Sequence, residues 1–97
     1  MHVISRKMLK LFWEKHPDAT EALKAWFYEA EAASWKSSAE LKGKYGSASI
    51  INAERVVFNI CGNKYRLVVR INYASGAVFI RFIGTHREYD TINVETI

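Results

Sequence analysis

The sequence contains few of the residues that cross-link small proteins or interrupt their regular structure. Among 97 residues there are one cysteine, one proline and five glycines. A single cysteine excludes an internal disulfide and fits a reducing cytosol. No apolar run is long enough to cross a membrane, and the first residues lack the apolar stretch of a signal peptide. We therefore expect a cytoplasmic protein.

The composition is that of an ordinary globular protein, with 49% hydrophobic and 25% charged residues. A chain of this length supports one hydrophobic core and leaves no room for a second, so residues 1–97 are expected to form a single domain. Cys61 lies in the apolar run that begins at Val56. A packed thiol is the favoured interpretation there, and a nucleophile is the alternative.

Positive charge is concentrated in the second half of the chain. The net charge is +4, yet the stretch from Arg55 to Arg87 holds six basic residues and no acidic ones. The first 54 residues hold eight basic and seven acidic residues. This asymmetry favours an anionic partner for the second half. The alternative is that the chain is simply a mildly basic protein.

Hydrophobic spacing predicts a short strand and three helices in the first half. The strand covers residues 2–4, and the helices cover residues 6–15, residues 18 to about 33 and residues 37–44. A proline after residues 6–15 ends the first helix, because the residue before proline avoids the helical region. The expected caps are Ser5 for the first helix, Asp18 with Glu21 for the second and Ser37 with Glu40 for the third.

The period changes to that of strands in the second half. Strands are predicted over residues 56–60, 64–73 and 78–83, and their short turns require antiparallel pairing. Residues 91–97 are expected to add a short strand or to form a loose tail. Along residues 64–73 two faces alternate. Tyr65, Leu67, Val69 and Ile71 share the apolar face, and Lys64, Arg66 and Arg70 share the other.

These elements predict an α+β fold, in which N-terminal helices pack on one face of a small, twisted, mostly antiparallel sheet. The opposite face is expected to be lined with cations. Arg81 joins Arg66 on this cationic face if Ile80 and Phe82 both enter the core.

Five consecutive polar residues follow the last predicted strand. All of them can transfer protons or hold charge: His86, Arg87, Glu88, Tyr89 and Asp90. Thr85 and Glu88 have the spacing of a capping box, so a short helical turn is expected to begin there. The segment is either a site at the end of the cationic face or a polar surface turn.

The residue types of this segment, together with the arginines of the sheet, suit the cleavage of RNA without a metal ion. That reaction needs a group to accept the proton of the ribose 2′-hydroxyl, a group to protonate the leaving oxygen, and cations to stabilise the transition state. The three histidines are scattered without ligand spacing, so no metal site is expected.

Two separated motifs carry a resemblance to a known family. Residues 57–69, VFNICGNKYRLVV, and residues 79–90, FIRFIGTHREYD, resemble the two core motifs of HigB-type toxins, which belong to the RelE-like mRNA interferase superfamily. Residues 12–19 and 33–35 resemble the same family. The resemblance covers nearly the whole chain and keeps the order of the motifs.

The resemblance implies a RelE-like fold and an endoribonuclease that cleaves mRNA on the translating ribosome by 2′-hydroxyl attack, without a metal or other cofactor. It also implies neutralisation by a HigA-type antitoxin with a helix-turn-helix domain, through which alone the toxin would reach operator DNA. No membrane partner is implied, and the resemblance is compatible with a homo-oligomer.

Candidate site residues follow from the resemblance. The catalytic candidates are Arg66, Arg81, His86, Glu88 and Tyr89, and the RNA-binding candidates at motif positions are Asn63, Lys64 and Asp90. Arg70 and Arg87 are at positions that look variable in the family, so they are candidates for RNA or ribosome contacts only. The roles of four of these residues have alternatives. Glu88 either caps the helical turn or transfers a proton, and Asp90 either positions its neighbours or acts directly. Arg66 and Arg81 bind RNA, pair with acidic residues of the antitoxin, or do both at different times.

Two other functions compete with the nuclease. The first is a basic RNA-binding or ribosome-binding module without chemistry, which would not require the segment from His86 to Asp90 beside the arginines. The second is a DNA-binding antitoxin, which is disfavoured because no helix-turn-helix pair is predicted and the positive charge lies on strands.

Overall fold

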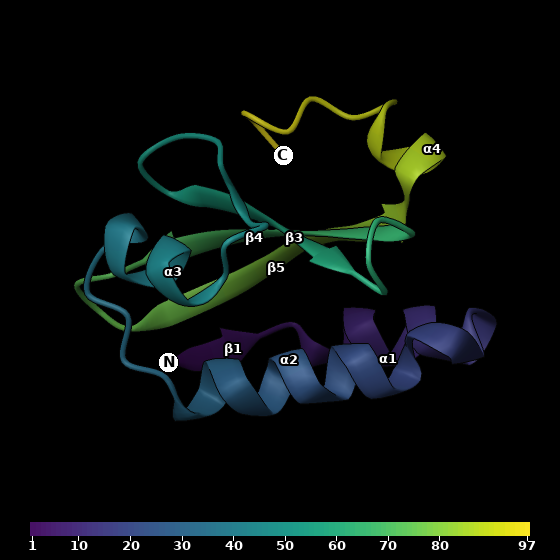
Figure 1. The fold of residues 1–97 in the computed structure, drawn as a ribbon, viewed down its shortest axis with the longest axis horizontal. Helices are drawn as coiled ribbons and strands as arrows, with labels where there is room; N and C mark the ends of the chain where they lie inside the picture. Colours follow the sequence, from purple (N-terminus) through teal and green to yellow (C-terminus); the bar gives the residue numbers. More distant parts are fainter.

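A five-stranded sheet forms the centre of the structure, a computed structural model that describes all of residues 1–97 (Figure 1). The strand order is β1-β5-β4-β3-β2. β3, β4 and β5 form the predicted antiparallel meander, and β1 lies parallel to β5 at one edge. The strands are β1 (His2–Ile4), β2 (Ser49–Ile50), β3 (Arg55–Ile60), β4 (Tyr65–Asn72) and β5 (Ala77–Thr85).

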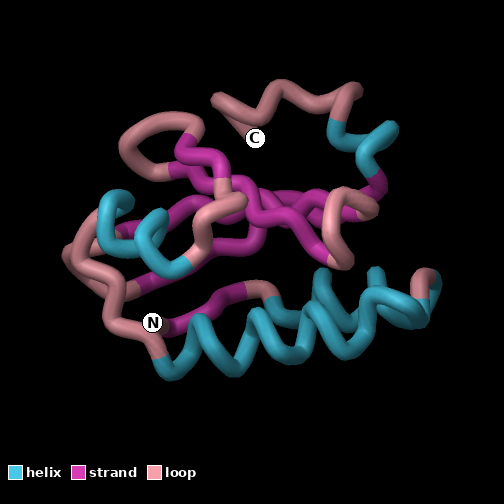
Figure 2. Tube along the Cα trace, viewed as in Figure 1, coloured by secondary structure: helices cyan, strands magenta, loops and turns pink.

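The two long helices cover one face of this sheet. α1 (Arg6–Lys15) and α2 (Thr20–Ala32) run below the strands in Figures 1 and 2, joined by a 3₁₀ turn, η1 (Pro17–Ala19). α3 (Ser38–Lys44) follows α2, and the short α4 (His86–Tyr89) follows β5 directly. This arrangement confirms the predicted α+β fold. None of the helices combines the length and apolar composition that crossing a bilayer requires.

Alternation along β4 places the core where the sequence predicts it. Tyr65, Leu67, Val69 and Ile71 are at most 2% exposed and belong to a cluster of 19 buried residues that includes residues of α1 and α2. Burial of these apolar side chains between helices and sheet is the main stabilising contribution to the fold.

One of the three predicted caps is wrong, and a second is confirmed in position only. Ser5 is the N-cap residue of α1 as predicted, but it has φ of 75° and its side chain makes no capping bond. Asp18 lies inside η1 instead of before α2, and its carboxylate accepts the Tyr65 hydroxyl at 2.7 Å and pairs with Lys64. Asp18 therefore binds residues of the β3–β4 hairpin instead of capping α2. Ser37 caps α3 as predicted, accepting the Glu40 amide.

A β-bulge in β5 changes the predicted faces of that strand. Val69 lies opposite Ile80 and Val68 lies opposite Phe82, which leaves Arg81 without a partner on β4. One extra residue shifts the alternation, because side chains repeat with a period of two. Ile80 is in the core as predicted, but Phe82 lies with Val68 on the far face, the sheet face opposite α1 and α2.

The last residues form neither an added strand nor a loose tail. After α4 the chain turns back above the far face (Figure 1), and the Arg55 Nε atom donates to the Ile97 carbonyl at 2.9 Å. Val57 and Val68 on the far face are 3% and 0% exposed. The terminal segment therefore covers part of the face that was expected to be open.

Candidate functional site

The segment with the proton-transferring residues is a short helix that is fixed by its cap. The Thr85 hydroxyl accepts the Glu88 amide at 3.1 Å, and Glu88 Oε1 accepts the Thr85 amide at 2.8 Å. This is the capping box that the sequence predicts. A four-residue helix is too short to be stable alone, so the cap and the contacts of α4 with β4 and β5 set its position.

His86 begins α4 with its imidazole in solvent. Its Nδ1 atom lies 3.4 Å from Asp90 Oδ2, and the two side chains are 56% and 63% exposed. The contact becomes an ion pair when the imidazole is protonated. An exposed imidazole beside a carboxylate can both accept and donate a proton to a bound substrate.

The structure gives Glu88 a capping role. The Thr85 main-chain N–H that donates to its carboxylate holds the pKa of Glu88 below its usual value, and the positive charges of His16 and Lys15 act in the same direction. Burial opposes this shift. Since a carboxylate with a lowered pKa is ionised near neutral pH, Glu88 is unsuited to donate a proton.

Gly84 allows Phe82 and α4 to pack together. A Cβ atom on this buried glycine would lie 2.5 Å from Phe82 Cζ and 3.1 Å from Glu88 Oε1. The Phe82 ring in turn lies 6.5 Å from the half-buried Tyr89 ring, centroid to centroid. Tyr89 is therefore held against the end of β5.

The two candidate catalytic arginines lie on neighbouring strands that lead to α4. Arg66 is paired with Gly84, two residues before His86. It lies on the far face, because its neighbours Tyr65 and Leu67 are in the core. Its guanidinium donates to the Asn63 carbonyl at 2.8 Å and to the Tyr65 carbonyl at 3.3 Å. Arg81 is exposed at the bulge, about 10 Å along β5 from Gly84.

The other candidates are not all at this end of the sheet. Lys64 reaches the helix layer and pairs with Asp18, so it does not join the cationic face. Arg70 lies four residues from Arg66, about 13 Å away, and donates to Glu54 at 2.9 Å. Asn63 in the β3–β4 turn and Arg87 in α4 are exposed near the site end.

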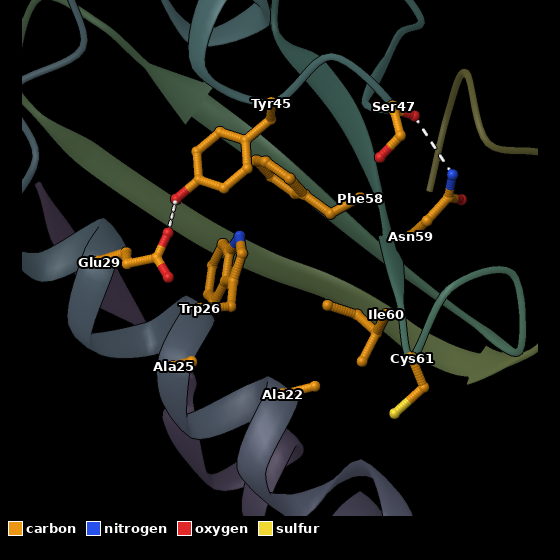
Figure 3. Close-up of a pocket in the computed structure, with 10 residues that line it drawn as sticks. All are labelled: Ala22, Ala25, Trp26, Glu29, Tyr45, Ser47, Phe58, Asn59, Ile60 and Cys61. Atoms are coloured by element: carbon orange, nitrogen blue, oxygen red, sulfur yellow. Dashed lines mark hydrogen bonds between the residues drawn. The ribbon is translucent and has the colours of Figure 1, made fainter.

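A cavity elsewhere in the molecule is lined by none of the residues from His86 to Asp90. It has a volume of about 170 Å³ and lies between α2 and β3 (Figure 3), with Ala22, Trp26 and Phe58 in its wall. Cys61 stands at its rim, half-buried, with Sγ 3.3 Å from the Asp18 carbonyl. This packed position agrees with the favoured interpretation of the thiol.

Sequence reasoning missed two residues that shape the site, Phe82 and Gly84. The prediction that Arg81 joins Arg66 required Phe82 to enter the core, because the bulge has no signature in the alternating pattern. Gly84 carried a usable signal, since a glycine inside a strand often marks a close approach of another group.

Comparison with known proteins identifies the family. The model of the HigB toxin family, described as the RelE-like toxic component of a toxin–antitoxin system, matches residues 19–92. The mRNA interferase toxin HigB of Escherichia coli K12 is 33% identical over 92 residues, which cover 93% of this chain and 88% of that protein. Proteins named mRNA interferase HigB from Escherichia coli O157:H7 and Shigella flexneri match to the same extent.

The matched region contains both sequence motifs. It also contains the strands from β3 to β5 and the whole of α4. The chain therefore belongs to the HigB family of RelE-like toxins.

Proposed function

We propose that this toxin is an endoribonuclease that cleaves mRNA on the translating ribosome by metal-independent attack of the ribose 2′-hydroxyl. The observation that carries the proposal is the position of α4. Its exposed His86 directly follows the strand that pairs with Arg66 and contains Arg81. The names of the similar proteins support mRNA as the substrate.

In this mechanism His86 transfers protons at the 2′-hydroxyl or at the leaving 5′-oxygen. Arg66 and Arg81 stabilise the negative charge of the transition state, the role that preorganised cations have in phosphoryl transfer. Tyr89, packed on Phe82, supplies a hydroxyl at the same end of the sheet. Glu88 acts through the cap of α4 and so positions His86 and Tyr89.

RNA binding extends around these groups. Asn63 and Arg87 flank the site end, and Asp90 orients the His86 imidazole. Arg70 contacts RNA farther along the sheet if a bound strand displaces it from Glu54. Lys64 serves RNA binding only by leaving Asp18, and its present contact favours a structural role.

The partner that silences this activity is proposed to be a HigA-type antitoxin with a helix-turn-helix domain. The family description supports an antitoxin as partner. Operator DNA is contacted through that antitoxin, and the toxin acts in the cytoplasm, where translated mRNA is found.

The test is induction of the chain in a bacterium, with growth and mRNA integrity as the two measurements. Wild type is expected to stop growth and cut translated messages. Changing His86→Ala should slow cleavage by about 10²- to 10⁴-fold, and Arg81→Ala by about 10²- to 10³-fold. Lys36→Ala, an exposed cation outside the site, is the matched control and should remain toxic.

Equal toxicity of wild type and both site variants at equal expression would reject the residue assignments. Growth arrest by wild type with intact mRNA would favour the competing function, a basic RNA-binding or ribosome-binding module without chemistry.

A further inference from the structure

A groove lies between α1 and the end of β5, on the helix side of the sheet. Its volume is about 320 Å³, and its apolar wall consists of Met8, Leu11, Phe12 and Ile83. Leu11 is 52% exposed and lies beside the other apolar residues of this wall, so the exposed apolar surface is contiguous. The groove therefore leaves apolar surface uncovered.

The charged rim of the groove connects it to the candidate active site. Lys15 and His16 line one part of the rim, and Glu88 lines another. Glu88 is the residue whose carboxylate caps α4 and fixes the position of His86. A molecule seated in the groove would therefore touch the cap on which the catalytic segment depends.

The edge of β5 beside the groove has no strand partner over part of its length. β1 pairs only with Ala77, Val78 and Phe79, so no strand lies beside this edge from Ile80 to Gly84, and the Thr85 amide already donates to Glu88 Oε1. Such an edge offers main-chain donors and acceptors to an added protein segment. An apolar wall and a free strand edge fit a protein better than a phosphodiester chain.

The charge of α1 indicates what kind of segment would be attracted. Lys7, Lys10 and Lys15 are exposed on this helix, and Glu14 is its only acidic residue. Complementary charge steers association and suppresses wrong partners. The expected occupant therefore carries apolar side chains flanked by acidic residues.

We propose that this groove docks a segment of the antitoxin that combines apolar and acidic side chains, and that docking there silences the toxin through Glu88 and the end of β5. The inference rests on the proposed function, because it names how the partner reaches the site described above. It assigns recognition to α1, an element outside both sequence motifs.

The test compares Leu11→Glu with Tyr28→Glu for binding of the antitoxin encoded beside the toxin gene. Tyr28, on α2 and outside the groove, is 64% exposed, so it is a matched control. Leu11→Glu should weaken antitoxin binding at least about tenfold, because it places a charge on the apolar wall next to Glu88. Tyr28→Glu should bind like wild type, and both should cleave RNA at the wild-type rate when free.

Three other outcomes overturn the proposal. Unchanged antitoxin affinity of Leu11→Glu would exclude the groove as the docking site. Lost RNA cleavage by free Leu11→Glu, with a wild-type melting temperature, would assign the groove to RNA instead. A changed oligomeric state of the free toxin with unchanged antitoxin affinity would assign it to a second copy. If wild type cleaves no RNA, the nuclease proposal fails while the binding comparison still tests the groove.

Discussion

At the residue scale, Gly84 shows how one missing side chain permits the site. The Phe82 ring and the Glu88 carboxylate occupy the space that a Cβ atom would need. Phe82 supports Tyr89, and Glu88 caps α4, so both supports of the segment meet at this glycine. The glycine of the second motif is therefore explained by packing and not by an unusual backbone angle.

Gly84→Ala is expected to destabilise the protein by about 1–3 kcal/mol, the usual cost of an extra methyl group in a packed site. Urea unfolding measures this change. Gly43→Ala is the control, because a Cβ atom at Gly43 in α3 meets nothing within 4 Å and alanine favours a helix. Equal stability of Gly84→Ala and wild type would show that Phe82 and Glu88 move aside without cost.

At the element scale, the β3–β4 hairpin is tied to the turn between α1 and α2. The Asp18 carboxylate accepts the Tyr65 hydroxyl at 2.7 Å and pairs with Lys64 at the tip of the hairpin. The Phe12, His16 and Tyr65 rings pack beside this contact, with the His16 ring stacked on Phe12 at 4.4 Å. The contact sets the hairpin tip, which also carries Asn63 and leads into Arg66.

This contact predicts a pH dependence of stability. Hydrogen bonds from Lys64 and then Tyr65 hold the pKa of Asp18 below its ordinary 3.8. A carboxyl group with a lowered folded-state pKa stabilises the fold above its unfolded pKa, and that contribution is lost as pH falls through the folded value. Wild type should therefore melt at a higher temperature than Asp18→Asn at pH 7, and the difference should close in acid.

Thermal melts measure this difference in melting temperature, from neutral pH to a pH well below the ordinary pKa of Asp18. Glu14→Gln serves as the control, because Glu14 is exposed and has no ion-pair partner. A difference between wild type and Asp18→Asn that stays constant at every pH would contradict the assignment.

The sequence predicted the elements well, because local signals determine them. The spacing of apolar residues located the long helices and every strand except β2, and the Thr85–Glu88 spacing located the cap of α4. Asp18 was misassigned because a residue that suits a cap also suits a distant lysine and tyrosine, and only the fold decides between them. The bulge at Arg81 was not predictable from alternation, since Arg81 is compatible with either register.

At the scale of the whole molecule, the two faces of the sheet differ in what they contact. The helix face is filled by the core, and the far face holds Arg66, Arg70 and the returning terminal segment. The sequence predicted the apolar helix face and the positions of Arg66 and Arg70 on the far face, but not that Phe82 joins Val68 there. It did not predict the terminal segment, whose contacts are main-chain carbonyls accepting from Asn52 and Arg55.

The groove beside α1 could not be predicted from the sequence either. It exists because β1 ends at Ile4 while β5 continues to Thr85, a difference that only strand pairing reveals. The charge count drew attention to the second half of the chain, yet α1 in the first half also exposes several lysines. Locally balanced stretches can therefore hide a charged surface.

In the proposed mechanism, α4 and the arginines of the sheet promote attack by a ribose 2′-hydroxyl. The most direct measurement is the cleavage rate of an mRNA on purified translating ribosomes, with a single 2′-deoxy sugar at the cleaved position. Without the 2′-hydroxyl, cleavage there should fall at least about a hundredfold, and the normal message should yield a 2′,3′-cyclic phosphate end. Cleavage of the deoxy-substituted message at the normal rate would contradict the account.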